Sequence, residues 1–431
     1  MGSFSSVRNV KGAIILYDIA DISLAAGGQD KISWVKSNMP LLRHLEAEFS
    51  KNKPFEGLTV ALSIHLEAKT AYLCRVLAAG GAKMYITGSN PLSTQDDVAA
   101  ALAADGLNVY ARYGVDSKLY KEHLKKVIEP GPHIIIDDGG DLVNLIHNEY
   151  QELLPRVLGG CEETTTGIGR LVAMQAAGKL HFPMICVNNA KCKYLFDNRY
   201  GTGQSVWDAI NSTTNLIAAG KMVVVAGYGW GGKGVAMRAL GLGASLIVTE
   251  IDPIKALEAK MDGFKVMPMR DAAALGDIFI TVTGCKDVID TEDFKLMKDG
   301  AILCNAGHFN VEINIDSLEA AAVEKKQRRR NIMGYKMADG RWLNLLAEGR
   351  LVNLAAGDGH PAEIMDMSFA IQALSAAFLA KNKGLPSGFP LLSDVPQEID
   401  QEVARLLLEF SGLEIDRLTS EQSNYLNSYN L

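Results

Sequence analysis

The chain has 431 residues, of which 48% are hydrophobic, and a formal net charge of −7. This length predicts two or three domains, and the negative charge argues against a nucleic-acid-binding protein. No apolar stretch approaches the roughly 20 residues of a membrane span. The six cysteines lack metal-ligand spacing, so we expect a cytoplasmic protein with reduced thiols, no membrane contact and no metal site.

The first 198 residues alternate apolar strand patterns with helix patterns. The expected strands are 59–64, 83–86, 133–136 and 183–187. Polar residues follow the strand ends, among them His65, Ser89, Asn90 and Asp138. Strands that alternate with helices predict a mostly parallel, doubly wound sheet, in which ligands bind outside the carboxyl ends of the strands. This half therefore predicts a substrate domain with its own crevice, with ordinary polar loops as the alternative.

Two polar segments close to the end of this half could carry chemistry. Glu162 and Glu163 precede three threonines, a run that favours contacts with ribose diols and amides over core packing. Lys193 and Asp197 lie four residues apart, so on a helix they share a face. A surface ion pair is the commoner reason for this spacing, whereas a lysine beside a carboxylate can also manage the proton of a hydroxyl.

Residues 222–253 contain a dinucleotide-binding fingerprint. An apolar strand at 222–226 is followed by Gly227, Gly229 and Gly232, a helix pattern, a second strand at 245–249, and Glu250. The glycines permit a tight turn, the approach of a pyrophosphate, and close packing of helix on strand. A carboxylate at the end of the second strand accepts hydrogen bonds from a ribose diol and repels a 2′-phosphate. The pattern therefore predicts NAD rather than NADP.

Further apolar runs continue this cofactor half. They are 278–283, 301–305, 343–346 and 351–354, and all four are expected to be strands. The basic run 325–330 is expected to be a solvated connector. A helix pattern at 364–381 follows the break at 357–361, and we expect it to return to the first domain. The stretch from about 394 predicts one or two amphipathic helices that dock on another subunit.

These patterns predict an α/β fold with two doubly wound, Rossmann-like domains and a short C-terminal helical segment. The expected division is a discontinuous substrate domain (1–198 and 361–393), an NAD-binding domain (199–360), and an oligomerisation segment (394–431). The two crossings, near 199 and 360, are expected to be hinges. His308 and His360, in glycine-flanked turns, would then lie close to the cleft.

The motifs, in their order, resemble the S-adenosyl-L-homocysteine hydrolase family along nearly the whole chain. The matching blocks include SNPLSTQDD at 89–97, DDGGDL at 137–142, EETTTG at 162–167, FDNRYG at 196–201, VVAGYG at 224–229 and LAEGRLVNL at 346–354. The resemblance implies hydrolysis of the thioether of S-adenosyl-L-homocysteine, or of its inosyl analogue, to a nucleoside and L-homocysteine. It also implies one tightly bound NAD per subunit and a homotetramer that closes around its ligand, with a small-molecule nucleoside thioether as substrate.

The resemblance implies a reaction sequence as well. Bound NAD⁺ transiently oxidises the 3′-carbon of the ribose, loss of the 4′-proton expels the thiol from the 5′-carbon, water adds, and the ketone is reduced again. The implied catalytic residues are Lys193, Asp197 and Asn198 for the 3′-hydroxyl proton, Glu163 for the ribose hydroxyls, and His65, Asp138 and His308 for the 4′-proton and the 5′ position. The implied NAD contacts are Thr164, Thr165, Thr166, Glu250, Asn305 and Asn353, beside the glycines. The implied substrate contacts are Glu67, Lys69, Ser89, Asn90, Asp358 and His360.

The chain departs from the family pattern at a few positions. Trp230 and Gly231 replace the usual Asp-Val after the second glycine, and Thr202 replaces a family cysteine. Many members end in a Lys and Tyr tail that reaches the NAD of a neighbour, whereas this chain ends in SYNL, so we expect that contact to differ.

The most informative departure concerns the purine base. Adenosine-specific members resemble His-x-Thr-x-Glu or His-x-Thr-x-Gln where residues 65–69 read HLEAK. The ammonium of Lys69 has three donors and no acceptor, which suits the 6-carbonyl of hypoxanthine. This resembles the subgroup that prefers S-inosyl-L-homocysteine. If Lys69 instead pairs with a nearby acid, adenine could be read by backbone, so the base preference stays open. A catalytically silent NAD-binding homologue and an ordinary dehydrogenase are the alternatives of another class.

Overall fold

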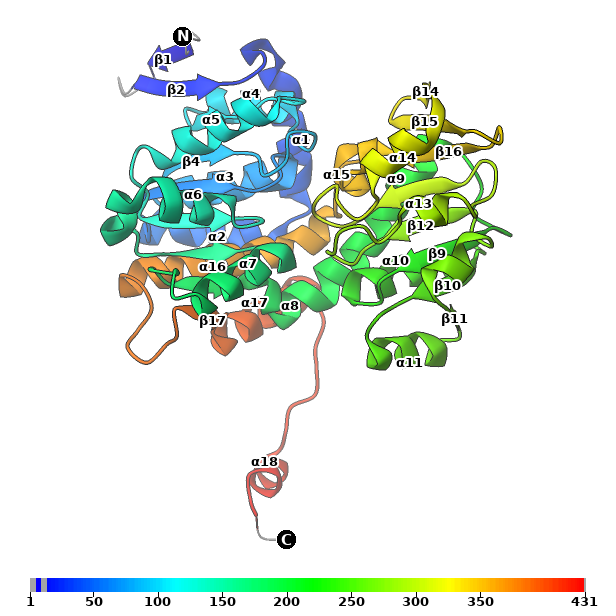
Figure 1. Ribbon diagram of the computed structural model, residues 1–431. Helices are drawn as coiled ribbons and strands as arrows, with labels where there is room; N and C mark the ends of the chain where they lie inside the picture. Colours follow the sequence, from blue (N-terminus) through cyan, green and yellow to red (C-terminus); the bar gives the residue numbers. More distant parts are fainter. Residues whose placement is uncertain (1–4, 9–13, 430–431) are drawn as a thin grey trace.

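The computed structural model describes residues 5–8 and 14–429 and shows two α/β bodies side by side (Figure 1). The final residues 430 and 431, part of the tail that departs from the family pattern, lie outside the described range. Each body is built on one sheet with helices on both faces. The expected class, two doubly wound sheets followed by C-terminal helices, is confirmed.

The first sheet has the strand order β1-β2-β5-β4-β3-β6-β7-β8-β17. Every described pairing in it is parallel except that of β1 with β2. The strands are β1 Ser5–Arg8, β2 Ile14–Asp18, β3 Thr59–Ser63, β4 Lys83–Thr87, β5 Asn108–Tyr110, β6 Ile134–Asp137, β7 Gly159–Glu162, β8 Met184–Cys186 and β17 Leu392–Asp394. Since the chain runs outward in both directions from β3, this strand marks the point where a ligand crevice forms.

Helices bury both faces of the first sheet. Val60 and Leu62 of β3 pack into one core and Ala61 into the other, as the two-residue period of a strand requires. The helices are α1 Ala25–Ser37, α2 Pro40–Asn52, α3 Ala68–Ala79, α4 Asp96–Ala104, α5 Ser117–Ile128, α6 Asp141–Glu149, α7 Thr165–Ala176 and α16 Ala362–Asn382. Burial on both faces explains why the strands read as continuous apolar runs.

The second sheet has the order β11-β10-β9-β12-β13-β16-β15-β14. Its strands are β9 Met222–Ala226, β10 Ser245–Thr249, β11 Lys265–Val266, β12 Ile278–Thr281, β13 Ile302–Asn305, β14 Ala322–Arg329, β15 Ile332–Met337 and β16 Trp342–Leu346. Its helices are α9 Thr202–Thr214, α10 Trp230–Gly241, α11 Pro253–Met261, α12 Met269–Ala273, α13 Thr291–Phe294, α14 Ile315–Ala321 and α15 Val352–Ala355. The order reverses at β9, so the turn that follows β9 faces the first body's crevice.

Two expectations in this second body were wrong. Residues 352–354 lie in the short helix α15 rather than in a strand, and only Leu351 makes a bridge, to Asn305. A short apolar run has no period that distinguishes helix from strand. Residues 325–330 lie mostly in the strand β14 rather than in a connector. This strand lies at the edge of its sheet and is exposed from Val323 onward, so it carries no apolar alternation.

Helix α16 returns to the core of the first sheet. It has 21 residues and a mean hydropathy of 1.3, which is enough by length and composition for a membrane span, so the expectation that no stretch approaches this was wrong. However, 67% of its most apolar window is buried. Phe369, Ile371 and Leu379 pack among the residues of β3, α2 and α3. A helix that is apolar on all sides is here a core helix.

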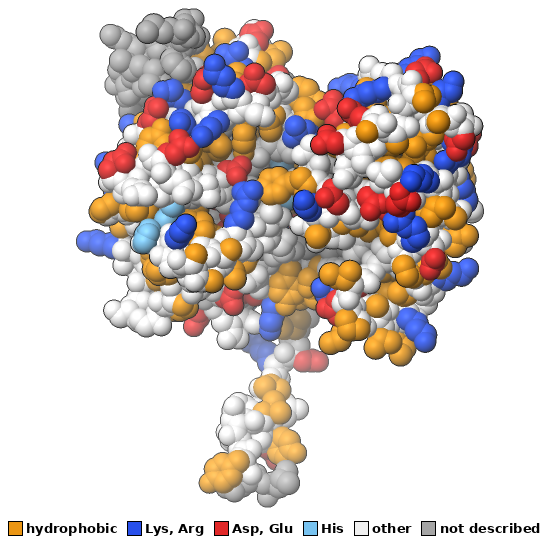
Figure 2. All heavy atoms as spheres, viewed as in Figure 1, with side chains coloured by type: hydrophobic (Ala, Val, Ile, Leu, Met, Phe, Trp, Pro, Cys, Tyr) orange, Lys and Arg blue, Asp and Glu red, His pale blue; other side chains and the backbone are white. Residues whose placement is uncertain are grey.

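The C-terminal helices are confirmed as α17 Gln397–Phe410 and α18 Ser420–Leu426. Helix α17 packs against α16 and α2. The segment after it projects away from both bodies (Figure 1). Its apolar side chains are exposed, among them Ile415 at 70% and Leu426 at 65% (Figure 2).

Candidate active site

A cavity of about 620 Å³ lies between the two bodies. It opens at the carboxyl ends of β3, β6, β7 and β8 on one side and at the β9–α10 turn on the other. Fifteen of the residues expected in a site line it: His65, Glu67, Lys69, Asp138, Glu163, Thr164, Thr165, Thr166, Lys193, Asp197, Asn198, Gly229, His308, Asn353 and His360. Residues from 65 to 360 therefore meet in one place because the chain crosses between the bodies twice.

Lys193 is the centre of a buried cluster of oxygen atoms. It ends the single turn α8 Lys191–Lys193 and precedes a π-helical segment, η4 Tyr194–Gly201. Its Nζ lies 3.4 Å from Asp197 Oδ1 and 3.5 Å from Glu163 Oε1. The same ammonium donates to Asn198 Oδ1 at 2.9 Å and to Asn188 Oδ1 at 3.2 Å. One cation thus serves two carboxyl groups and two amides.

The two carboxyl groups in this cluster differ in their protonation. Burial acts to raise the pKa of Asp197, but Lys193 and His360 hold this pKa well below its usual range. His360 Nδ1 lies 3.0 Å from Asp197 Oδ1, and Ser368 Oγ donates to Asp197 Oδ2 at 2.7 Å. Burial raises the pKa of Glu163 to about 8, against the attraction of Lys193. Asp197 is therefore the ionised partner, and Glu163 holds a proton near neutral pH.

The lysine stays charged despite its burial. Burial favours the neutral amine, but the carboxyl groups of Asp197 and Glu163 outweigh it and raise the pKa of Lys193. An ammonium and an ionised carboxylate held 3.4 Å apart can together hold and release the proton of a hydroxyl placed between them.

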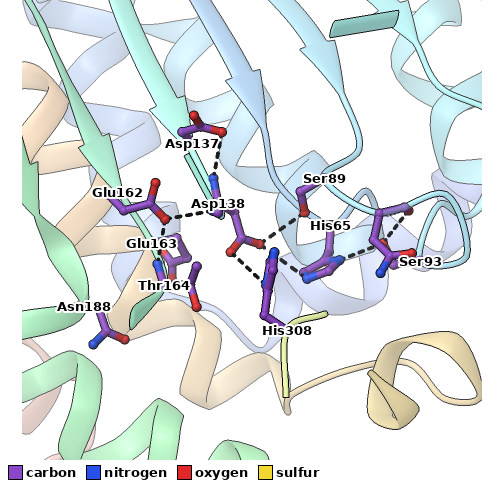
Figure 3. A network of polar contacts seen from close by, with 12 residues as sticks. His65, Ser89, Ser93, Asp137, Asp138, Glu162, Glu163, Thr164, Asn188 and His308 are labelled. Atoms are coloured by element: carbon purple, nitrogen blue, oxygen red, sulfur yellow. Dashed lines mark hydrogen bonds and ion pairs between the residues drawn. The ribbon is translucent and has the colours of Figure 1, made fainter. Parts of the chain in front are cut away.

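A second cluster joins His65, Asp138 and His308 (Figure 3). His65 Nε2 lies 3.4 Å from Asp138 Oδ2, and His308 Nδ1 lies 3.9 Å from Asp138 Oδ1. Ser89 Oγ donates to Asp138 Oδ2 at 3.3 Å. The ligand atoms of the three residues lie within 4.8 Å of one another, a spacing that would also suit a divalent cation, which the sequence did not lead us to expect.

The hydroxyl of Ser93 orients His65. It donates to the backbone oxygen of Asn90 at 2.9 Å, so it accepts from His65 Nδ1 at 2.7 Å. The proton of the neutral ring then lies on Nδ1, and Nε2 presents a lone pair toward Asp138. Burial lowers the pKa of His65 to about 4, against the attraction of Asp138. At neutral pH this ring is therefore uncharged, with Nε2 unprotonated.

Lys69 lies at another wall of the cavity. Glu67 caps α3 by accepting from the backbone N–H groups of Lys69 and Thr70, at 3.0 Å and 3.2 Å. Lys69 Nζ lies 2.6 Å from Glu67 Oε2 and donates to the backbone oxygen of Asp358 at 2.8 Å. The side chain is 7% exposed. Lys69 thus pairs with a nearby acid, Glu67. It also contacts Asp358, which lies close to the second crossing of the chain between the bodies.

The β9–α10 turn fits a dinucleotide. Gly227 has φ +98°, and a Cβ there would lie 2.9 Å from the oxygen of Val282. A Cβ at Gly232 would lie 2.0 Å from the oxygen of Gly227, so helix and strand pack only because both residues are glycine. Gly229, the N-cap of the 12-residue helix α10, faces open space in the cavity. The N-terminus of this helix therefore offers its free N–H groups to a phosphate.

Some expected site residues do not line the cavity. Glu250 accepts from three backbone N–H groups, those of Tyr228 at 2.7 Å, Ile251 at 2.7 Å and Asp252 at 3.0 Å. Burial would raise the pKa of Glu250, but these donors lower it. Glu250 therefore orders the turn at the end of β10 while remaining ionised.

The others support residues that do line the cavity. Asn305 is fully buried and donates to the backbone oxygens of Gly307, Phe309 and Gly349. Ser89 donates to Asp138, and the backbone oxygen of Asn90 accepts from Ser93. Asp358 lies in an adjoining cavity of about 510 Å³, and its side chain accepts from Gln95 at 3.1 Å.

The sequence interpretation gave no site role to several buried polar residues that shape the site. They are Asp137, Glu312, Ser368 and Gln372. Ser368 and Gln372 lie one turn apart on α16 and bond Asp197 and Glu163, the latter at 2.5 Å. Glu312 accepts from the backbone N–H groups of Thr283 and Gly284, and burial raises its pKa. Two polar residues four positions apart in a largely apolar helix were the available signal, but their partners lie 171 and 209 residues earlier in the chain.

A dinucleotide-binding turn that faces a buried lysine–carboxylate cluster and a His–Asp–His cluster defines an NAD-dependent enzyme. More specifically, the chain belongs to the S-adenosyl-L-homocysteine hydrolase family. Residues 16–153 match S-adenosyl-L-homocysteine hydrolase, and residues 198–359 match the NAD binding domain of S-adenosyl-L-homocysteine hydrolase. The expected cofactor, NAD, is confirmed by this match.

Similar proteins carry two different names. An adenosylhomocysteinase of Thermococcus kodakarensis is 58% identical over 413 residues, which cover 96% of this chain and 98% of that protein. An adenosylhomocysteinase of Thermotoga maritima is 56% identical, with 93% and 99% covered. An S-inosyl-L-homocysteine hydrolase of Methanosarcina mazei is also 56% identical, with 94% and 98% covered. Overall identity therefore does not separate the two bases.

Proposed function

We propose that this protein hydrolyses the thioether of a nucleosyl-L-homocysteine to a nucleoside and L-homocysteine. The observation that carries the proposal is that two acid–base clusters, around Lys193 and around Asp138, face one cavity beside the dinucleotide turn. When bound, NAD supplies reversible hydride transfer at the ribose. The remaining steps are proton transfers, which need positioned acids and bases.

The Lys193 cluster acts on the 3′-hydroxyl of the ribose. Asp197 and Lys193 together hold and return its proton, and Asn198 keeps the ammonium in place through a 2.9 Å hydrogen bond. Glu163, which holds a proton near neutral pH, can both donate to and accept from the neighbouring ribose hydroxyl. Gln372 fixes the other oxygen of Glu163.

The His65 cluster acts on the far side of the ribose. The free Nε2 of His65 accepts a proton, and Asp138 stabilises the imidazolium that forms. This pair removes the 4′-proton and protonates the leaving thiolate. His308 lies beside the other oxygen of Asp138. Ser89 holds Asp138 by a hydrogen bond, and the backbone oxygen of Asn90 holds Ser93, which orients His65.

The cofactor contacts follow the same division between direct and supporting residues. Thr164, Thr165, Thr166, Gly229 and Asn353 line the cavity and would hold NAD there. Gly227 and Gly232 allow the turn, and Asn305 holds the loops behind it. Glu250 directly follows β10 and, beside its three backbone donors, would have acceptor capacity left for a ribose diol.

Lys69 pairs with Glu67, the arrangement in which backbone groups could read adenine, but one further ammonium proton is left, and on that ground we propose the inosyl substrate. Two of the three ammonium protons of Lys69 are directed to Glu67 and to the oxygen of Asp358. The third can donate to a 6-carbonyl, whereas the amine of adenine would meet donor against donor. Glu67, Lys69, Asp358 and His360 form this end of the substrate site, and S-adenosyl-L-homocysteine is the alternative substrate.

We further propose the division into a substrate domain (1–198 and 361–393), an NAD-binding domain (199–360) and an oligomerisation segment (394–431). The core packing of α16 against the first sheet supports the discontinuous domain. A cytoplasmic homotetramer is the proposed assembly. Exposed apolar side chains support self-association, both on the projecting C-terminal segment and on α11, where Ile254 is 75% and Met261 is 82% exposed.

One assay tests the proposal. The purified protein is desalted, its bound NAD is measured, and thiol release from the adenosyl and inosyl substrates is followed side by side. We expect retained NAD, thiol release, and no net NADH. A parallel sample with a chelator controls for a cation at His65, Asp138 and His308. Retained NAD without thiol release from either substrate would point to the catalytically silent homologue.

A further inference from the structure

The carboxyl group of Glu162 holds two loops of the site at once. It is fully buried at the end of β7, and its Oε1 accepts from the backbone N–H groups of Gly139 at 2.9 Å and Thr164 at 3.0 Å (Figure 3). Gly139 directly follows Asp138 of the acid–base cluster. Thr164 begins the run of threonines that line the cavity on the cofactor side. A single oxygen atom therefore connects the two.

Both backbone polar groups of Gly139 are hydrogen-bonded. Its N–H is bound by Glu162, and its C=O accepts from Arg170 Nη1 at 2.7 Å. A Cβ at Gly139 would lie 2.7 Å from His308 Nε2, so this peptide packs directly against the histidine. A shift of the Gly139 peptide would therefore move Asp138 and disturb its relation to His308.

The carboxyl group is also seated against the first turn of α7. Thr164 is the N-cap of this 12-residue helix. A Cβ at Gly167 would lie 2.1 Å from Glu162 Cδ, so only glycine admits the carboxyl group here. Glu162 thus fixes the point at which the threonine run turns into the helix.

The function of this group depends on an acceptor oxygen rather than on charge. Glu162 Oε2 has no hydrogen-bond partner in the part of the chain that the structure describes. Burial, with the neighbouring Asp137 and Asp138, raises the pKa of Glu162 well above its usual range, although the two backbone N–H groups oppose this. A neutral carboxyl group still offers its carbonyl oxygen to both N–H donors.

We infer that Glu162 is a positioning residue that couples the cofactor-binding threonine run to the Asp138 acid–base cluster. It does so through one acceptor oxygen shared by the amides of Thr164 and Gly139. The inference rests on the proposed function, since it concerns the same site. It goes beyond that proposal because it links the position of the cofactor-side threonines to the position of Asp138 through one residue.

The test compares two substitutions of different chemistry. Glu162→Gln keeps a carbonyl oxygen of the same reach, and Glu162→Leu removes it. Asp366→Leu is the matched control, because Asp366 is also fully buried and accepts from two backbone N–H groups, those of Leu41 at 2.8 Å and Leu42 at 2.9 Å. Asp366 does not line the cavity among the described residues.

The measurements are Tm, NAD retained after gel filtration, kcat and KM for thiol release, and the pH profile of kcat. We expect Glu162→Gln to stay within a few-fold of the wild type in all of them. Glu162→Leu should lose at least about tenfold in NAD affinity and in kcat, and its pH profile should shift because Asp138 is displaced. Asp366→Leu should lower Tm by a similar amount without either effect.

Two results would overturn the inference. One is that Glu162→Leu and Asp366→Leu behave alike, which would leave Glu162 a merely structural residue. The other is that Glu162→Gln is as impaired as Glu162→Leu, which would show that charge is needed. If the wild type releases no thiol, the proposed function fails, and NAD retention by the two Glu162 variants still decides whether this carboxyl group supports the cofactor side.

Discussion

Lys193 Nζ and Asp197 Oδ1 lie 3.4 Å apart at the start of a π-helical segment, and both side chains are nearly fully buried. A π-turn widens the helix, and such turns are frequent at functional sites. Here the widened segment, Tyr194–Gly201, places Lys193, Asp197 and Asn198 around one point at the chain crossing between the two bodies. The surface ion pair that was the alternative for this spacing is excluded by the burial.

Replacing Lys193 by methionine is expected to remove turnover while the fold is retained. The side chain keeps its volume, but the ammonium that serves Asp197 and Glu163 is lost. Loss of one acid–base group costs on the order of 10²–10⁴ in rate. Thiol release measures this, with Lys191→Met as the control, since Lys191 is an exposed neighbour. Thiol release near the wild-type rate in Lys193→Met would show that the lysine has no part in proton transfer.

Stability is expected to depend on pH through Asp366. Burial raises the pKa of this carboxyl group from 3.8 to about 7. Because the folded-state pKa lies above the unfolded value, the contribution of Asp366 to stability is fully present below about pH 4 and is lost as the pH rises through about 7. The free energy of unfolding of the wild type, measured from pH 4 to 8, should therefore fall more steeply than that of Asp366→Asn. Equal slopes would contradict the assignment.

The strands and the dinucleotide turn could be predicted from sequence because their signals are local. A run such as 222–226 and the glycines after it lie within one structural unit. The polar shell could not be predicted, because Ser368 and Gln372 read as ordinary polar positions in an apolar helix until the fold brings them to Asp197 and Glu163. Glu162 was read together with Glu163 as one motif, yet Glu162 ends β7 and Glu163 follows it, and their side chains hold different partners.

Glu250→Ala is expected to weaken NAD binding. A hydrogen bond to a charged group contributes about 1.5–3 kcal/mol, which corresponds to roughly a tenfold to hundredfold loss of affinity. The structure adds a second cause, since the carboxylate also binds three backbone N–H groups of the turn. Glu250→Gln, which keeps one acceptor oxygen, should be intermediate. Cofactor content after dialysis measures both, and unchanged NAD in Glu250→Ala would show that Glu250 does not reach the ribose.

The last prediction concerns Lys69 and the purine base. The ammonium is held by Glu67 at 2.6 Å and by the oxygen of Asp358 at 2.8 Å, so its direction is fixed before any ligand binds. A 6-carbonyl then gains a charge-assisted hydrogen bond, whereas an adenine amine leaves buried donors unpaired. Such a mismatch costs about 1–3 kcal/mol, or roughly one to two decades in kcat/KM.

Lys69→Gln should therefore shift the preference toward the adenosyl substrate, because glutamine offers both a donor and an acceptor. The measurement is the ratio of kcat/KM for the inosyl and adenosyl substrates in the wild type and the variant. Lys121→Gln is the control, since Lys121 is exposed and pairs with Glu149 on the far side of the first sheet. A general loss of activity would lower both values and leave the ratio unchanged. A ratio that does not move in Lys69→Gln would mean that Lys69 only neutralises Glu67 and that the backbone at Asp358 reads the base.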